Sequence, residues 1–332
     1  MSPALLPTLH VVPAYSDNHV VTRAHLALFA KDGKLRCHFS DGASKLLAPH
    51  VVGVRTDFYV VKDEGGRDPS FEQAMSGSEG SAMDVLRDIA GRWPLSGDDA
   101  AALAEYLGLA VVRSPAFRAW YDRANEEALA DPETRASSGL PDDVFDQMAQ
   151  ELRSQRSRIE MMARLISRMA TLLGSMHWTL IRFSSPRLAI SDNPLVAVPL
   201  SVGYTGPAVG MPGGVEDLIE VRLPVDPRHL LLLSWIDAPD DTPIVTGRHE
   251  WIRGINAATV MQAEQHWMHR PGPTPPHVAD ASPSLALAIY ADAAAQGARD
   301  GRRRKAAWTA VAAVRADEDD WSTMRLVQAA FE

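Results

Sequence analysis

The spacing of the apolar residues changes near Gly174, and this change restricts the fold more than any other feature of the chain. Before it, apolar residues recur at intervals of three and four, as in the stripe Ile159, Met162, Ile166, Met169 and Leu173. After it, the apolar runs are short and suit strands. A side chain returns to the same face every 3.6 residues in a helix and every second residue in a strand. The sequence therefore predicts an α+β protein in which 70–174 is almost wholly helical and 177–235 is mostly strand.

The predicted sheet is largely antiparallel, and its strands lie on both sides of the helical region. Apolar runs predict strands at Leu35–Phe39, Phe58–Val61, Trp178–Phe183, Leu188–Ile190, Leu195–Leu200, Leu218–Leu223 and Leu230–Trp235. We expect Trp178–Phe183 and Leu188–Ile190 to form a hairpin, because a short Ser-Ser-Pro turn separates them. The run Leu230–Trp235 is apolar throughout, which is typical of a central strand. His19–Phe29 reads as a strand or a short arm, and 201–217 as a Gly/Pro-rich loop of a kind that often lies over a pocket.

The helical region contains recognisable start and stop signals. Ser96-Gly-Asp-Asp resembles a capping box at the start of a helix, and Gly174 is a stop signal. Residues 130–141 read as a loop, Asp142–Leu173 as one long helix, and His249–His269 as a final helix. We expect these helices to pack against the sheet.

The chain divides into three parts by composition. Residues 1–270 read as a single α+β domain, 271–276 as a Pro-rich linker, and 277–332 as an appendage with a basic cluster at Arg302–Lys305. No apolar run is long enough to span a bilayer, and the first residues do not resemble a signal peptide. We therefore expect no membrane partner.

Charge and cysteine content exclude several classes of protein. The 332 residues carry a net charge of −9, which makes nucleic-acid binding unlikely. Cys37 is the single cysteine, so neither an internal disulfide nor a cysteine-based zinc site is possible, and a reducing cytoplasm is the expected location. Cys37 reads as a small buried hydrophobe, with a reactive thiol as the alternative.

Two charged residues interrupt apolar helix stripes. Glu79 shares a stripe with Met75, Ala82, Leu86 and Ile89, and Arg113 shares one with Leu103, Tyr106, Ala110 and Phe117. A buried charge is costly unless it is paired. Glu79 and Arg113 could form a salt bridge between two helices. Alternatively, both could converge with Asp192 and a histidine on a cavity.

Further candidate site residues follow an apolar strand or lie near one. Ser191-Asp192-Asn193-Pro194 could place Asp192 and Asn193 in a site at the end of a strand, or it could simply form a turn. His19 and His25 could each be a base, a metal ligand or a structural hydrogen-bonding residue. Asn256 could bind substrate or bind backbone groups. His249, His266 and His269 have spacings that suit no metal motif, and we interpret them as surface or packing residues.

Several of these pieces together resemble an uncharacterised bacterial family, domain of unknown function 4238. His19-Val-Val-Thr-Arg-Ala-His-Leu-Ala-Leu-Phe29 resembles its opening motif His-x-Val-Pro-x-x-x-Leu-x-x-Phe, except that Thr22 stands where the family prefers Pro. An earlier His10-Val-Val-Pro13 has the Pro but lacks the Leu and Phe that should follow. The other matching elements are, in order, Asp57-Phe58-Tyr59, Glu79, Arg113-Ser114-Pro115, Ser191–Pro194 and Asn256. The resemblance covers about 19–270, and it implies no settled activity.

These observations lead to two functional hypotheses. The first is a small cytoplasmic hydrolase in which Glu79 or His19 is the base, with Asp192 as a third catalytic residue. In it Arg113 binds an anionic group, while Asn193 and Asn256 position the substrate. A divalent metal held by Glu79, Asp192 and His19 is a variant, whereas no nucleotide-binding motif is present. The second hypothesis is a non-enzymatic interaction protein whose buried charges are structural. The sequence leaves the small-molecule substrate and the oligomeric state open.

Overall fold

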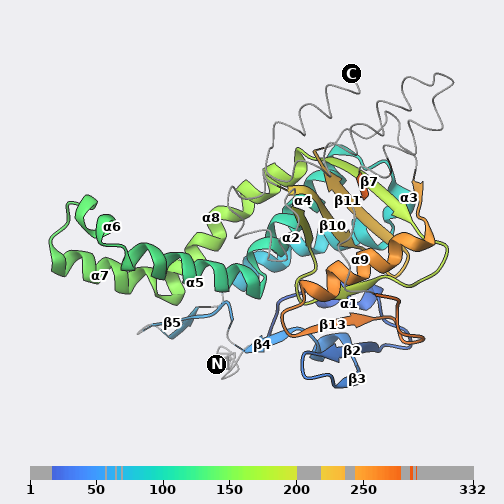
Figure 1. Ribbon diagram of the computed structural model, residues 1–332, viewed down its shortest axis with the longest axis horizontal. Helices are drawn as coiled ribbons and strands as arrows, with labels where there is room; N and C mark the ends of the chain where they lie inside the picture. The colour runs from blue at the N-terminus through green and yellow to red at the C-terminus, as the bar shows by residue number, and fades with distance from the viewer. Residues whose placement is uncertain are drawn as a thin grey trace, which may run out of the picture.

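A computed structural model of the chain has the predicted α+β architecture (Figure 1). It describes residues 17–56, 58–63, 66–68, 70–199, 218–235, 244–277, 285–286 and 289. The predicted loop at 201–217, Asp57 of the family motif and the basic cluster Arg302–Lys305 lie outside these ranges. Within them, no helix is long and apolar enough to cross a membrane.

The segment 70–174 is helical almost throughout, as predicted. Its helices are α2 (Ser70–Arg87), α3 (Ile89–Arg92), α4 (Gly97–Val112), α5 (Pro115–Ala130), α6 (Pro132–Ser137), α7 (Asp142–Leu152) and α8 (Gln155–Gly174). The predicted cap at Ser96 is confirmed, since its hydroxyl accepts a hydrogen bond from Asp99 N at 3.2 Å. The prediction of one helix over Asp142–Leu173 is wrong, because Ser154 starts a new helix by accepting from Ser157 N. The prediction of a loop at 130–141 missed α6, which Asp131 caps.

The larger sheet has five strands in the order β12-β7-β11-β10-β9. They are β7 (His177–Arg182), β9 (Val196–Pro199), β10 (Leu218–Pro224), β11 (His229–Ser234) and β12 (Val245–Thr246). All neighbours are antiparallel except β12 and β7. The apolar run at Leu230–Trp235 forms the central strand β11, as expected for a strand that is buried on both faces.

A second, four-stranded sheet has the order β3-β2-β13-β8. Its strands are β2 (Leu35–Phe39), β3 (Ser44–Leu47), β8 (Ala189–Ser191) and β13 (His266–His269). The predicted hairpin is wrong, because β7 pairs with β11 and β8 pairs with β13 in the other sheet. The final helix was also predicted too long: α9 (His249–Met261) ends before β13, which hydrogen-bonds to β2 and β8.

The N-terminal region is less regular than predicted. It contains β1 (Asp17–His19), α1 (Arg23–Leu28), the short 3-10 helix η1 (Pro49–Val51), β4 (Val54–Thr56), β5 (Val61–Asp63) and β6 (Gly66–Asp68). The expected strand or arm at His19–Phe29 is thus mainly a helix. Strand β1 pairs with β4, which places His19 opposite Val54.

The core lies on both faces of the larger sheet. One face packs against α2, α4 and α8 through Val221, Leu223, Leu231 and Leu233, and the other packs against α9 and the smaller sheet through Ile181, Leu230 and Leu232. Gly108 lets α4 and α8 approach closely, because a Cβ atom there would lie 2.5 Å from the carbonyl oxygen of Ile166. Cys37 is fully buried in this core, and burial raises its pKa to about 12. It is therefore a packing residue and a poor nucleophile.

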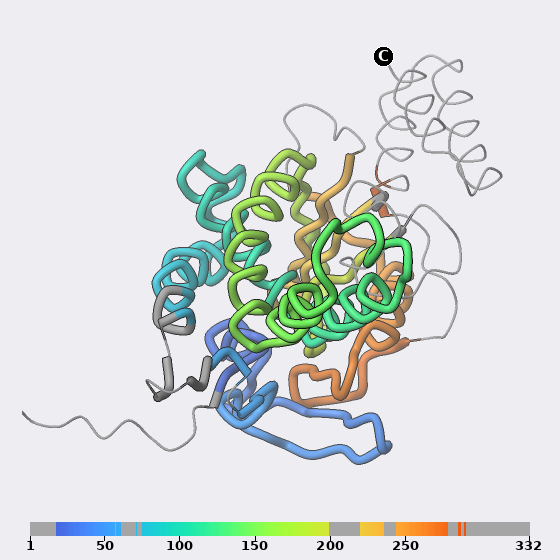
Figure 2. The backbone as a smooth tube through the Cα atoms, turned by 90° about the vertical axis from the view of Figure 1, so that its left-hand side faces the viewer, coloured from blue at the N-terminus to red at the C-terminus, as the bar shows by residue number. Residues whose placement is uncertain are grey.

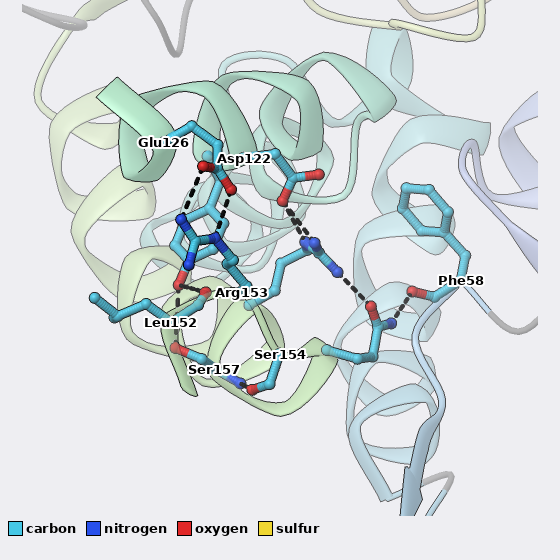
Figure 3. A network of polar contacts seen from close by, with 10 residues as sticks. Phe58, Asp122, Glu126, Leu152, Arg153, Ser154 and Ser157 are labelled. Atoms are coloured by element: carbon cyan, nitrogen blue, oxygen red, sulfur yellow. Dashed lines mark hydrogen bonds and ion pairs between the residues drawn. The ribbon is translucent and has the colours of Figure 1, made fainter. Parts of the chain in front are cut away.

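Three helices, α5, α6 and α7, form an arm that projects from the body of the molecule (Figure 1), and Figure 2 views this arm along its length. A polar network holds its base (Figure 3). Arg158 on α8 donates to Asp122 on α5, and Arg153 donates to Glu126 through two nitrogens at 2.7 and 3.0 Å. Gln155 donates to the carbonyl oxygen of Phe58 at 2.6 Å. The arm is thereby fastened to α8, and α8 is fastened to the segment before α2.

Residues beyond the predicted linker also contribute to the core. The described side chains of Leu285, Ala286 and Ile289 are buried in the same apolar cluster as α9. The carboxylate of Glu220 on β10 accepts from the backbone nitrogens of Leu285 and Ala286 at 3.1 and 2.8 Å. It is also paired with Arg222, and both side chains are fully buried.

Candidate functional site

Glu79 on α2 and Arg113 after α4 form an ion pair between Arg113 Nη1 and Glu79 Oε1. Their side chains are only 16% and 8% exposed, so the predicted burial in one polar cluster is confirmed. The hydroxyl of Thr22 joins the pair: it donates to Glu79 Oε1 at 2.8 Å and accepts from Arg113 Nη1 at 3.2 Å. We call His19, Thr22, Glu79 and Arg113 the Arg113 cluster.

The Arg-Ser-Pro motif explains how Arg113 reaches this position. Arg113 is the C-cap residue that follows α4, and Ser114 caps α5 by accepting from Phe117 N at 3.1 Å. Pro115 suits the first turn of α5, where it replaces an N–H that has no helical partner. Tyr59 stabilises this turn. The hydroxyl of Tyr59 donates to the carbonyl of Arg113 at 2.8 Å, and the Arg113 guanidinium lies 5.7 Å from the centre of the Tyr59 ring.

His19 is the last residue of β1, and the positive charge of Arg113 acts on its imidazole ring. Burial and the positive charge of Arg113 lower the pKa of His19, while the nearby carbonyls of His50 and Pro49 act in the opposite direction. Within the described residues, His19 Nε2 and Arg113 Nε are both buried and have no hydrogen-bond partner. The imidazole of His19 is therefore neutral near pH 7. The neighbouring Arg113 has an N–H group on Nε with no acceptor among the described residues.

Asp192 has a different environment. Its side chain is fully buried, and its two oxygens accept from the backbone nitrogens of Glu264 and Gln265, each at 2.8 Å. Asp192 thus closes the turn that leads from α9 into β13. His266 Nδ1 lies 3.8 Å from the carboxylate; burial lowers the pKa of His266, and the charge of Asp192 opposes that shift.

Asn193 and Asn256 also bind backbone groups around α9. Asn193 Nδ2 donates to the carbonyl of Gln262 at 2.6 Å. Asn256 accepts from Ala189 N at 2.9 Å and donates to the carbonyls of Arg187 and Pro276 at 2.9 and 3.2 Å. These amides join β8 and the linker to α9.

The structure therefore brings together three of the predicted site residues, His19, Glu79 and Arg113. In the described part of the chain, no hydrogen bond or ion pair joins them to Asp192, Asn193 or Asn256. Nor does any group of three or more His, Cys, Asp or Glu residues there have the arrangement of a metal site. The catalytic assignment of Asp192 and the three-ligand metal site stay predictions that no contact in the described residues supports.

The two hydrogen bonds of Asp192 give a testable expectation. Asp192→Asn should lower the free energy of unfolding by about 1–3 kcal/mol, because the amide nitrogen would face a backbone N–H and leave it without an acceptor. Urea denaturation checks this, with the exposed Asp143→Asn as the matched control. An unchanged stability together with a lost activity would show instead that Asp192 is catalytic.

Comparison with known proteins supplies the relationship. Residues 17–272 match the model of a family described as a protein of unknown function, DUF4238. The chain belongs to this family. The match begins after His10, which supports His19 as the histidine of the opening motif. Comparison with curated proteins and with solved structures found no match.

Two polar features of this DUF4238 chain were not predicted from its sequence. Thr22 replaces the Pro that the family prefers, and its hydroxyl bridges Glu79 and Arg113. The buried pair Glu220 and Arg222 has a clear signal, since two charges at i and i+2 in an apolar strand share one face. His25, by contrast, is structural: it bonds Tyr106 Oη and the carbonyl of Pro224, each at 2.9 Å, and burial lowers its pKa to about 4.

Proposed function

We propose that this protein is a small cytoplasmic hydrolase whose site is the Arg113 cluster, with His19 as the general base and Arg113 as the group that binds a negative charge on the substrate. The observation that carries the proposal is the pair of buried nitrogens, His19 Nε2 and Arg113 Nε, which lack partners among the described residues. Buried polar atoms in folded proteins nearly always have a partner. The positive charge of Arg113 acts on His19, and two unpartnered nitrogens on residues that interact in this way favour a polar ligand at the Arg113 cluster.

The protonation state of His19 suits a base. Its lowered pKa keeps the ring neutral near pH 7. Nε2 has no hydrogen-bond partner in the described chain, and we assign the role of the base to this nitrogen. An imidazole that carries its proton on Nδ1 has a lone pair on Nε2, which is the form a base requires.

The reaction then follows ordinary acid–base chemistry. A water molecule gives a proton to His19 Nε2 while its oxygen attacks the electrophilic atom of the substrate, and the imidazolium returns that proton to the leaving group. Arg113 stabilises the negative charge of the substrate through Nε. Glu79 and Thr22 are positioning residues, because both hold Nη1 of the guanidinium and leave Nε free.

A pH profile tests the role of His19. The purified chain is assayed with p-nitrophenyl acetate, p-nitrophenyl phosphate and bis(p-nitrophenyl) phosphate. We expect His19→Gln to lower kcat by about 100-fold or more for any substrate that is turned over, with an unchanged melting temperature. Because the neutral ring is active and its pKa is lowered from 6.5, kcat/KM should fall on acidification with a midpoint below pH 6.5.

The exposed His249 on α9 supplies the control for this experiment, since His249→Gln should leave both kcat and the acid limb unchanged. If none of the three compounds is hydrolysed faster than in buffer, or if His19→Gln is as active as the unmodified chain, the hydrolase proposal fails.

One observation favours the alternative of a non-enzymatic interaction protein. Val144 and Met148 on α7, and Leu140 just before it, are 42%, 36% and 40% exposed and follow one another at intervals of four. Helix α7 contains four carboxylates and no basic residue. Such an acidic helix with an apolar stripe suits a basic amphipathic partner. Replacing the three apolar residues by serine should leave hydrolysis unchanged if the arm only binds a partner.

A further inference from the structure

The outer face of the smaller sheet carries a pair of histidines that does not belong to the Arg113 cluster. On β2 and β13, His38 lies opposite Trp267, and His269 is two residues further along β13. Side chains alternate between the faces of a strand, so these three share one face, whereas Cys37 and Met268 point into the core. His38 Nε2 and His269 Nε2 lie 3.1 Å apart.

We propose that His38 and His269 bind a divalent transition metal ion such as Zn²⁺ through their Nε2 atoms, and that the ion clamps β2 to β13. Two nitrogens at about 2.0–2.1 Å from a tetrahedral zinc ion lie about 3.3 Å apart, close to the separation of this pair. The ring centres are 5.2 Å apart, so the two Nε2 atoms lie between the rings. An opening of a few tenths of an ångström would admit the ion.

The surroundings hold His269 in the form that binds metal. In the ion-free protein His38 Nε2 donates a hydrogen bond to His269 Nε2, and the metal ion takes the place of that proton. His269 Nδ1 donates to the carbonyl of Arg270 at 2.7 Å, which leaves the lone pair on Nε2, and metal-binding histidines commonly have such a support. His38 stacks on Trp267 with ring centres 4.0 Å apart and an interplanar angle of 6°, which fixes its direction. Burial lowers the pKa of His38 and brings that of His269 to about 4, so protons compete weakly for these nitrogens.

The pair is a two-ligand site rather than a complete cage. No third His, Cys, Asp or Glu of the described chain completes it, so water would fill the remaining positions. Arg36, which lies opposite His269, brings a positive charge near both rings and will weaken the binding. Imidazole ligands without carboxylates select zinc, nickel or copper over magnesium or calcium.

Calorimetric titration of the full chain with zinc chloride tests the proposal. We expect one zinc ion per chain from this pair, at least a tenfold loss of affinity in His38→Ala, and no change in His249→Ala. Zinc should also raise the melting temperature of the unmodified chain but not that of His38→Ala, because the ion stabilises only the form in which β2 and β13 are joined.

His38 is half-buried and His269 is buried, so His38→Ala is the deciding variant and His269→Gln is used only if it folds. The titration does not depend on hydrolysis, and its result is independent of the role of His19. If the unmodified chain binds no zinc, or if a folded His38→Ala binds it as tightly as the unmodified chain, the proposal is overturned. A magnesium chloride titration that gave the same affinity would also overturn it.

Discussion

Glu79→Ala will lower the free energy of unfolding by about 3 kcal/mol, because it removes the carboxylate and leaves the buried guanidinium of Arg113 with only Thr22 as its hydrogen-bond partner on Nη1. The exposed Glu105 on α4 is the matched control, and Glu105→Ala should cost less than about 1 kcal/mol. Equilibrium unfolding in urea measures both changes, provided that the slope with denaturant stays constant.

A double-mutant cycle separates the ion pair from general loss of packing. Replacing Glu79 and Arg113 together by methionine should restore most of the stability, since removal of a complete buried pair is often neutral whereas removal of one partner is not. If Glu79→Ala is no more harmful than Glu105→Ala, then Arg113 is hydrated in solution and the Arg113 cluster is not a closed structure.

Glu220→Ala will have a larger effect, about 4 kcal/mol, because Glu220 and Arg222 are both completely removed from water. The same carboxylate accepts the backbone N–H groups of Leu285 and Ala286. The substitution therefore takes away one partner of a buried charge and the acceptor of two buried backbone donors. Calorimetric unfolding of this variant and of Glu250→Ala, an exposed glutamate on α9, gives the comparison.

Hydrogen exchange tests the local part of this prediction. The amides of Leu285 and Ala286 should exchange much faster in Glu220→Ala, because nothing else described accepts their protons. Peptides from α8, which is far from this carboxylate in the sequence and packs on the other face of the sheet, should keep their protection if unfolding is not global. Protected amides at 285 and 286 in the variant would show that Glu220 does not hold this segment.

Much of the fold follows from local signals. The change of apolar spacing at Gly174 predicted the helices of 70–174 and the strands after them, and the cap at Ser96 was visible in four residues. Strand pairing was not predictable in the same way: β7 and β8 are separated by a turn that looks like a hairpin, yet each pairs with a strand from a distant part of the chain. Pairing depends on which apolar faces meet, and a single sequence does not contain that information.

The candidate site was predictable only where a charge broke an apolar pattern. Glu79 and Arg113 met this condition, and they form a pair. Asp192 did not, because the sequence Ser-Asp-Asn-Pro is equally suited to a site and to a turn. Its actual partners are the backbone nitrogens of Glu264 and Gln265, about seventy positions further along the chain. Backbone donors leave no mark in a sequence, so the structural role of Asp192 could not be read from it.

The arm has a mechanical consequence for the Arg113 cluster. Helix α5 begins at Pro115, two residues after Arg113, and its 16 residues extend about 24 Å from that point. The turn at Arg113 and Ser114 is therefore one of the two places where the arm joins the body of the molecule, the other being the turn at Ser154 before α8. A partner that bound α7 and displaced the arm would act on the turn at Arg113 and Ser114, and it would change the position of the guanidinium relative to Glu79. The ion pair of Arg158 and Asp122 at the base of the arm would oppose this displacement.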